Sequence, residues 1–149
     1  MAGITQALCT SFKKECLTAT HNFTASTGST FKIALFKAAA SIVGTYGAST
    51  TAYSSMTADE VSGTGYSAGG ATLTNVTPLV SGTTACVSFS NAAWTSASFT
   101  ARGALIYNST AGGNAVCILD FGSDKTVTSG TFTVQFPTDD ASTAVIRIV

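Results

Sequence analysis

Residues 101–136 read ARGALIYNSTAGGNAVCILDFGSDKTVTSGTFTVQF and carry the clearest fold signal in the chain. They hold three short apolar runs, at 104–107, 115–119 and 132–136, separated by clusters of Gly, Asn, Asp and Ser. Such runs between turn-forming clusters are typical of consecutive antiparallel strands. The middle run is apolar at every position, so it predicts a central strand covered on both faces. The last run alternates apolar and polar residues, which predicts one buried and one exposed face.

Further strands are predicted at 31–36, 71–76, 84–90 and 143–149. In the strand at 84–90 we expect Ala85, Val87 and Phe89 to share one face, with Cys86 on the other. Trp94 begins another predicted strand and serves as an anchor either in the core or in an interface. About seven to nine strands at this spacing predict a mainly β fold, an antiparallel β-sandwich or jelly-roll-like domain.

The N-terminal region differs from the rest. Ile4, Leu8 and Phe12 recur every four residues with charged residues elsewhere around the turn, which predicts an amphipathic helix between residues 4 and 23. We therefore divide the chain into an N-terminal helical arm, residues 1–24, and a β-sandwich domain, residues 25–149. The apolar stripe either packs on its own domain or reaches a neighbouring subunit, so Ile4, Leu8 and Phe12 are the candidate subunit interface. If the arm serves only assembly, deleting residues 1–20 leaves a folded sandwich.

Residues 38–60 contain few large apolar groups and many Ala, Ser and Thr. They predict a long irregular connection with a short strand near 51–53. Long loops in small domains are commonly functional, so this segment is a second candidate for intersubunit contact.

No motif in the chain supports catalysis. The only histidine, His21, follows the predicted helix, where a cap or a packed side chain is the common role. The glycine-rich segment 63–70 matches no phosphate-binding motif and predicts a turn or bulge before an edge strand. The aspartates fall in turns, where Asp ordinarily binds its own backbone. We therefore expect no enzyme activity and no catalytic, cofactor-binding or metal-binding residues.

The composition limits the classes of partner. Seven basic and seven acidic residues balance, so bulk charge favours neither nucleic acid nor a membrane surface. No apolar run reaches the length of a transmembrane helix. Charged residues make up 9% of the chain, against ~25% in typical domains. The abundant Ser and Thr that replace them suit either a protein packed against neighbours or an all-β domain.

The four cysteines form no CxxC pair and no metal-binding spacing. Cys86 and Cys117 lie in apolar strands and are expected to behave as small buried hydrophobic residues. We expect all four to be free thiols.

Five segments together resemble a small family of structural proteins of tailed bacteriophages. They read MAGITQALCTSFKKE at 1–15, TFKIALF at 30–36, EVSGTGY at 60–66, GALIYNST at 103–110 and VCILDFGSD at 116–124. The resemblance covers essentially the whole chain. These segments are typical of the family but contain no catalytic or binding motif. No functional residue can therefore be assigned in this chain from the resemblance.

The resemblance implies a virion component made in the host cytoplasm. Among virion roles we favour a capsid decoration, or cement, protein that binds the major capsid protein on the outer capsid and forms a homo-oligomer, commonly a trimer. The alternative is a tail protein, either an adaptor or a fibre component, although the single predicted helix is too short for a fibre shaft. A carbohydrate-binding enzyme domain is a third class, with no sequence feature in its favour.

Overall fold

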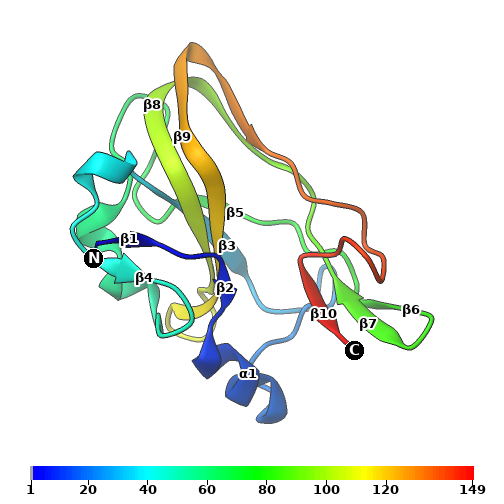
Figure 1. The fold of residues 1–149 in the computed structure, drawn as a ribbon. Coiled ribbons are helices and arrows are strands. Elements are labelled where there is room, and N and C mark those ends of the chain that lie inside the picture. Colours follow the sequence, from blue (N-terminus) through cyan, green and yellow to red (C-terminus); the bar gives the residue numbers. More distant parts are fainter. Residues whose placement is uncertain (1) are drawn as a thin grey trace.

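The computed structural model describes residues 2–149 (Figure 1). The strands are β1 (Gly3–Ile4), β2 (Ala7–Leu8), β3 (Phe31–Phe36), β4 (Thr45–Tyr46), β5 (Ala71–Thr72), β6 (Leu79–Ser81), β7 (Thr84–Val87), β8 (Ala92–Asn108), β9 (Asn114–Val134) and β10 (Ile146–Ile148). One α-helix, α1, spans Thr10–Leu17, and 3-10 turns lie at Ala39–Ser41, Tyr53–Ser55 and Thr57–Asp59. The described chain is mainly strands with one α-helix, as predicted.

The largest sheet has five strands in the order β2-β9-β8-β3-β5 and is antiparallel throughout. A second antiparallel sheet has three strands in the order β10-β7-β6 and lies at the lower right of Figure 1. The short β1–β4 pair is parallel. The strand predicted at 31–36 is confirmed as β3, with the predicted bounds.

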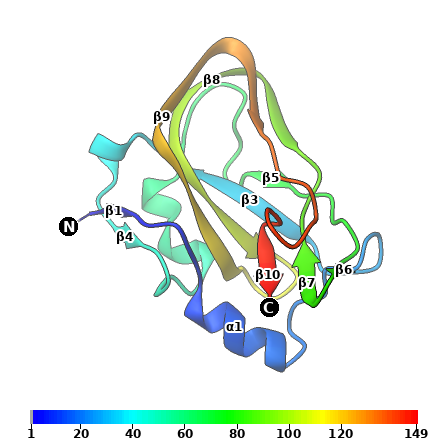
Figure 2. The same cartoon turned by 45° about the vertical axis from the view of Figure 1, so that its right-hand side comes forward.

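β8 and β9 form a long ribbon that bends and returns over the five-stranded sheet (Figures 1 and 2). At the bend the pairing moves from Ala101–Lys125 to Gly103–Asp120, so two steps along β8 match five along β9. Gly122 has a φ of 77° there, a conformation that favours glycine. The predicted turn at 122–130 is therefore wrong. Residues 125–127 and Gly130 pair with β8, residues 121–124 bulge out of the register, and the apolar residues on either side belong to one strand.

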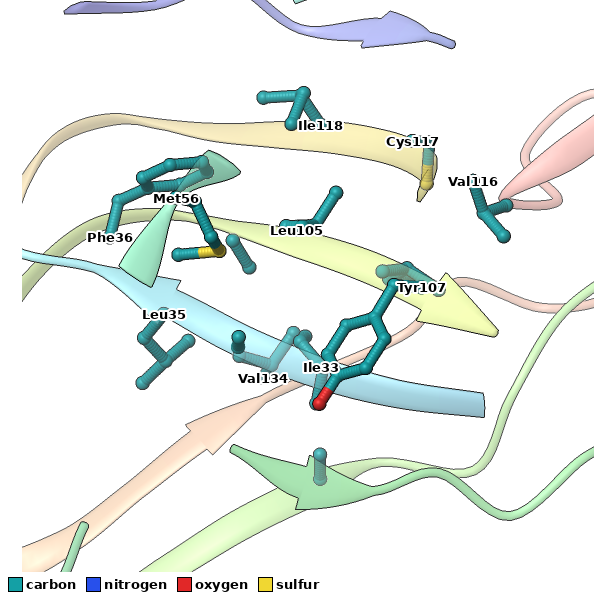
Figure 3. Close-up of a cluster of buried hydrophobic side chains, with 14 of the residues drawn as sticks. Ile33, Leu35, Phe36, Met56, Leu105, Tyr107, Val116, Cys117, Ile118 and Val134 are labelled. Carbon is teal, nitrogen blue, oxygen red and sulfur yellow. The ribbon is translucent and has the colours of Figure 1, made fainter. Parts of the chain in front are cut away.

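One face of the five-stranded sheet packs against the returning part of the ribbon. Ile33 and Leu35 on this face are fully buried, and Val134 from the returning part belongs to the same cluster (Figure 3). Phe31 stacks on Phe23 at 4.3 Å and lies 5.7 Å from Phe89. The returning ribbon and the three-stranded sheet thus complete one half of the core.

The other face of the sheet is covered by residues 38–60. Phe36 lies 4.7 Å from the ring of Tyr46, and Tyr107 stacks on Tyr53 at 4.6 Å. Met56 is fully buried and lies near Phe36 (Figure 3). The prediction that the 115–119 strand is covered on both faces is confirmed. The long connection, which we expected to be free for contact, supplies core side chains to its own domain.

The N-terminal helix is much shorter than predicted. Residues before Thr10 are extended: the Thr5 N–H donates to the Tyr46 carbonyl at 2.8 Å, and the Cys9 N–H donates to the Val116 carbonyl at 3.0 Å. A spacing of four residues occurs on one face of a strand as well as of a helix, because four is a multiple of the strand period. The accessible surface of 7190 Å² is close to the ~7,000 Å² expected for a compact monomer of this mass.

The predicted alternation is confirmed within β7: Val87 and Ala85 pair with Ile146 and Ile148 on one face, and Cys86 lies on the other. Cys86 is fully buried, whereas Ala85 is exposed. Beyond the strand, Ser88 and Phe89 are both buried, so the alternation that the prediction assumed ends with β7. The predicted strand thus included residues that leave the sheet.

Two smaller predictions are confirmed. The glycine-rich segment turns the chain into the edge strand β5: Gly70 has a φ of 70°, and a Cβ there would lie 1.8 Å from the Ile33 carbonyl oxygen. Trp94 is a core anchor, with its ring 6.0 Å from those of Tyr66 and Phe132.

Candidate binding surface

The longest uncharged segment of the chain contributes to one side of the molecule. The 41 residues from Val61 to Ala101 contain no Asp, Glu, Lys or Arg, whereas typical usage would place about ten there. They form β5, β6, β7 and the first half of β8. Interface centres are depleted of charged residues relative to other surface. This segment is therefore where a contact with another protein is most expected.

The three-stranded sheet carries an exposed apolar row. Ile146 pairs with Val87, and both pack on the core. Two residues further along the same face, Ile148, Ala85 and Val80 lie side by side across the three strands. All three are exposed, Val80 by 74% and Ile148 by 63%. The core-facing side of this sheet therefore extends beyond the core, and we call Val80, Ala85 and Ile148 the exposed row.

The edge of the same sheet lacks the usual protection. β6 is its outer strand and pairs only with β7. Edge strands commonly carry charged side chains that prevent pairing with other chains, but β6 reads Leu-Val-Ser and has only Pro78 before it. Leu79 on the opposite face is 41% exposed. The exposed row thus ends at an edge that permits contact.

A groove opens between the five-stranded sheet and the C-terminal segment. A cavity of about 700 Å³ lies there, and a second of about 420 Å³ adjoins it along β9. We call the two together the open-side groove. Its apolar walls come from β2, both parts of β9 and the C-terminal segment: Leu8, Leu119, Phe121, Phe132, Val134, Phe136, Val145 and Val149.

The candidate interface residues at the N-terminus turn inward. Phe12 is 3% exposed, and Ile4 and Leu8 are partly buried against the core. Leu8 also lines the open-side groove, so it alone of the three borders a candidate binding feature. A subunit contact through these side chains stays a prediction, and their packing leaves little surface for it.

Asp59 is the most deeply buried carboxylate in the described chain, and its role is structural. It accepts hydrogen bonds from the N–H groups of Val43 and Gly44, from the Tyr46 hydroxyl at 2.7 Å, and from Lys37 Nζ at 2.9 Å. Burial alone would raise its pKa, but these donors hold the pKa of Asp59 at about 2. Burial and the neighbouring Asp59 raise the pKa of Tyr46 to about 12.

The adjacent Glu60 ties two loops together. Its carboxylate accepts hydrogen bonds from the hydroxyls of Tyr53 and Tyr66, each at 2.7 Å, and from the Gly69 N–H at 2.8 Å. Burial and the Glu60 charge raise the pKa values of both tyrosines well above their usual range. With its oxygens occupied in this way, Glu60 fastens residues 38–70 to the sheet.

His21 is packed, as the sequence indicates. Its side chain is fully buried, with Nε2 2.7 Å from Glu15 and Nδ1 3.0 Å from the Asn108 amide. The Asn108 Oδ1 accepts from the Ala111 N–H, which orients the Asn108 amide to donate to His21. His21 therefore joins α1 to the end of β8.

The aspartates confirm turn chemistry in part. Asp140 accepts four hydrogen bonds from Thr138, Ser142 and Thr143, which hold its pKa well below the usual range. Asp120 accepts from the Gly122 N–H at 2.8 Å, as predicted, and also pairs with Arg102 at 3.0 Å. Asp139 differs from both, because its buried carboxylate oxygens have no hydrogen-bond partner. Burial and the neighbouring Asp140 raise the pKa of Asp139.

The four cysteines are free, as predicted, and Cys86 and Cys117 are buried. Burial raises the pKa of the Cys9 thiol to about 11 and that of Cys117 further. Within residues 2–149, no three His, Cys, Asp or Glu side chains form a group suited to a metal ion. The one α-helix described has eight residues, too few to cross a bilayer.

Comparison with models of protein families, with curated proteins and with solved structures finds no match to this chain. The exposed row and the open-side groove were not predicted. The uncharged segment and the apolar C-terminal strand are the sequence signals that could have indicated the row.

Proposed function

We propose that this chain is a structural protein of a tailed-bacteriophage virion, most specifically a capsid decoration protein that binds the major capsid protein. The proposal combines the sequence resemblance with one structural observation, the exposed row of Val80, Ala85 and Ile148 beside an uncharged edge strand. Burying an apolar surface of this kind against a partner is favourable, because it removes apolar side chains from water.

The chemistry of the chain suits a permanent assembly. A neutral, hydroxyl-rich surface adds many uncharged contacts, and repetition over a capsid lattice converts modest individual affinities into firm attachment. We propose a β-sandwich, in its finer form jelly-roll-like, as the scaffold and a homotrimer as the assembled state. The exposed row then faces the capsid protein.

The first experiment is immunogold labelling of purified particles of the phage that encodes this chain. Label over the whole head supports the decoration protein. Label confined to the tail would replace it with the alternative, a tail adaptor or fibre component, and absence of label would reject both.

A second experiment tests the exposed row itself. Particles lacking the protein are mixed with the purified chain, and co-sedimentation measures binding. Val80→Asp with Ile148→Asp should abolish binding, because two carboxylates would be buried without partners. Thr128→Asp, on an exposed part of β9 outside the row, is the matched control. Equal binding by both variants would contradict a capsid contact through this sheet.

A further inference from the structure

The open-side groove is continuous along β9. Its two cavities share Phe121, Val134 and Gln135, so they join where the two parts of β9 approach each other. Volumes of about 700 Å³ and 420 Å³ are within the range of ligand-binding clefts. Together the two cavities offer more space than a single side chain fills.

The walls of the groove leave apolar side chains incompletely covered. Leu119, Phe121 and Phe136 pack against the core but are only partly buried. Gln135 is exposed in the same wall, and its amide makes no hydrogen bond to any residue in the described range 2–149. A bound segment in which apolar and polar side chains alternate could make apolar contacts with these walls and a hydrogen bond with the Gln135 amide.

Two cationic side chains line the groove. Arg147 lines the larger cavity and Lys125 the smaller one, and no side-chain carboxylate lines either cavity in the described part of the chain. Arg147 Nη1 donates to the carbonyls of Ala141 and Ser142, and Lys125 Nζ lies 2.9 Å from the Ser123 hydroxyl. Within residues 2–149 neither cation forms an ion pair with a carboxylate, so each can meet an acidic group of a ligand.

We propose that the open-side groove binds an extended segment of a protein partner, with apolar residues at alternate positions and an acidic residue toward each end. An extended chain directs alternate side chains to one side, which matches the apolar wall. The acidic residues would meet Arg147 and Lys125. This inference rests on the proposed function for the partner's place in the virion, and it assigns that partner a second contact, separate from the exposed row.

The test uses the full chain and a synthetic peptide, acetyl-Asp-Val-Thr-Phe-Thr-Val-Asp-amide. The control peptide replaces both terminal Asp residues with Lys. Trp94 is the only tryptophan and lies 6.0 Å from Phe132 in the groove wall, so its fluorescence reports occupancy. The acidic peptide should bind saturably, and the basic peptide should bind more weakly. No binding of the acidic peptide, or equal binding of the two, would overturn the proposal.

Two variants locate the bound peptide. Lys125→Glu should weaken binding about fivefold or more, the effect of losing an exposed ion pair and adding repulsion. Gln135→Phe fills the groove without removing a hydrogen bond and should abolish binding. Lys13→Glu, on α1 and outside the groove lining, is the matched control and should leave affinity unchanged. Wild-type affinity in both groove variants would place the peptide elsewhere and refute the assignment.

The two proposals can fail separately. The peptide assay contains no virions, so its failure leaves capsid attachment through the exposed row intact. Val80→Asp with Ile148→Asp should bind the peptide normally while losing the particle.

Discussion

The five-stranded and the three-stranded sheets differ in what covers their apolar residues. The larger sheet is covered on both faces, by residues 38–60 on one side and by the returning ribbon on the other. The smaller sheet continues its core-facing side past the core and exposes Val80 and Ile148. The same kinds of residue therefore hold the fold together in one sheet and are available for binding in the other.

The buried carboxylates show a similar contrast. Asp59, beside the larger sheet, accepts hydrogen bonds from two backbone N–H groups, a tyrosine hydroxyl and a lysine. Asp139, in the segment leading to β10, has no partner for either oxygen. A fully satisfied polar network stabilises the native state, whereas an unpaired carboxylate destabilises it.

The largest expected effect comes from removing the N-terminal segment. Deleting residues 1–20 takes away the β2 pairing with β9 and the buried Cys9 and Phe12. Loss of a buried Phe alone costs about 3–5 kcal/mol, a large part of the stability of a domain. We expect the truncated chain to lose its cooperative thermal transition in circular dichroism. A sharp transition near that of the intact chain would show instead that these residues are a dispensable arm.

A matched pair of isoleucines compares the two sheets directly. Ile33→Ala, at a fully buried position of β3, should lower the free energy of unfolding by about 2–5 kcal/mol in urea denaturation. Ile148→Ala, at a 63% exposed position of β10, should lower it by about 1 kcal/mol or less and should weaken particle binding. Similar losses of stability in the two variants would mean that the Ile148 side chain is buried in the core.

The Asp59 network should be costly to break. Asp59→Asn removes the carboxylate that pairs with Lys37 and replaces one accepting oxygen with an NH2 group that cannot accept. The free energy of unfolding should therefore fall by about 3 kcal/mol at pH 7. Asp124→Asn, at an exposed carboxylate that accepts from the Ala39 N–H, is the control.

The pH dependence of the same network has a definite sign. The pKa of Asp59 in the folded chain, about 2, is below its unfolded value. Its stabilising contribution is therefore complete above about pH 4 and is lost as the pH falls toward 2. Urea denaturation between pH 7 and pH 2 should show the Asp59→Asn deficit shrinking with acid, and a deficit that stays constant would contradict the assignment.

The smallest effect is expected at Asp139. Because its pKa is raised in the folded chain, ionisation at neutral pH destabilises the native state. Asp139→Asn should therefore raise the free energy of unfolding at pH 7, by about 1 kcal/mol, and the gain should vanish below about pH 4. A loss of stability at pH 7 would mean that the carboxylate has a partner in solution.

Local patterns predicted the elements whose neighbours in sequence decide their environment. β3 was predicted with its bounds because the large apolar residues Phe31, Ile33 and Leu35 occur at every second position. The sequence also indicated that His21 packs, that Trp94 is an anchor and that Cys86 and Cys117 are buried, because residues of these types are often buried. The helix was too long because a four-residue spacing is ambiguous between helix and strand.

Long-range pairing accounts for most of the remaining errors. The 122–130 segment has the composition of a turn, yet the pairing of residues 125–127 and Gly130 with β8 carries the strand on through a bulge. The exposed row likewise depends on the pairing of β7 with β6 and β10, which are far from each other in the sequence. No local pattern could assign either feature.

The amino-acid sequence by itself establishes a mainly β chain with free cysteines, a balanced charge and a long uncharged segment, because these properties depend on composition and on short-range periodicity. The exposed row and the open-side groove depend on the tertiary structure. Val80, Ala85 and Ile148 become neighbours only when three strands align, and Lys125 and Arg147 share a groove only because β9 bends back toward the C-terminal segment.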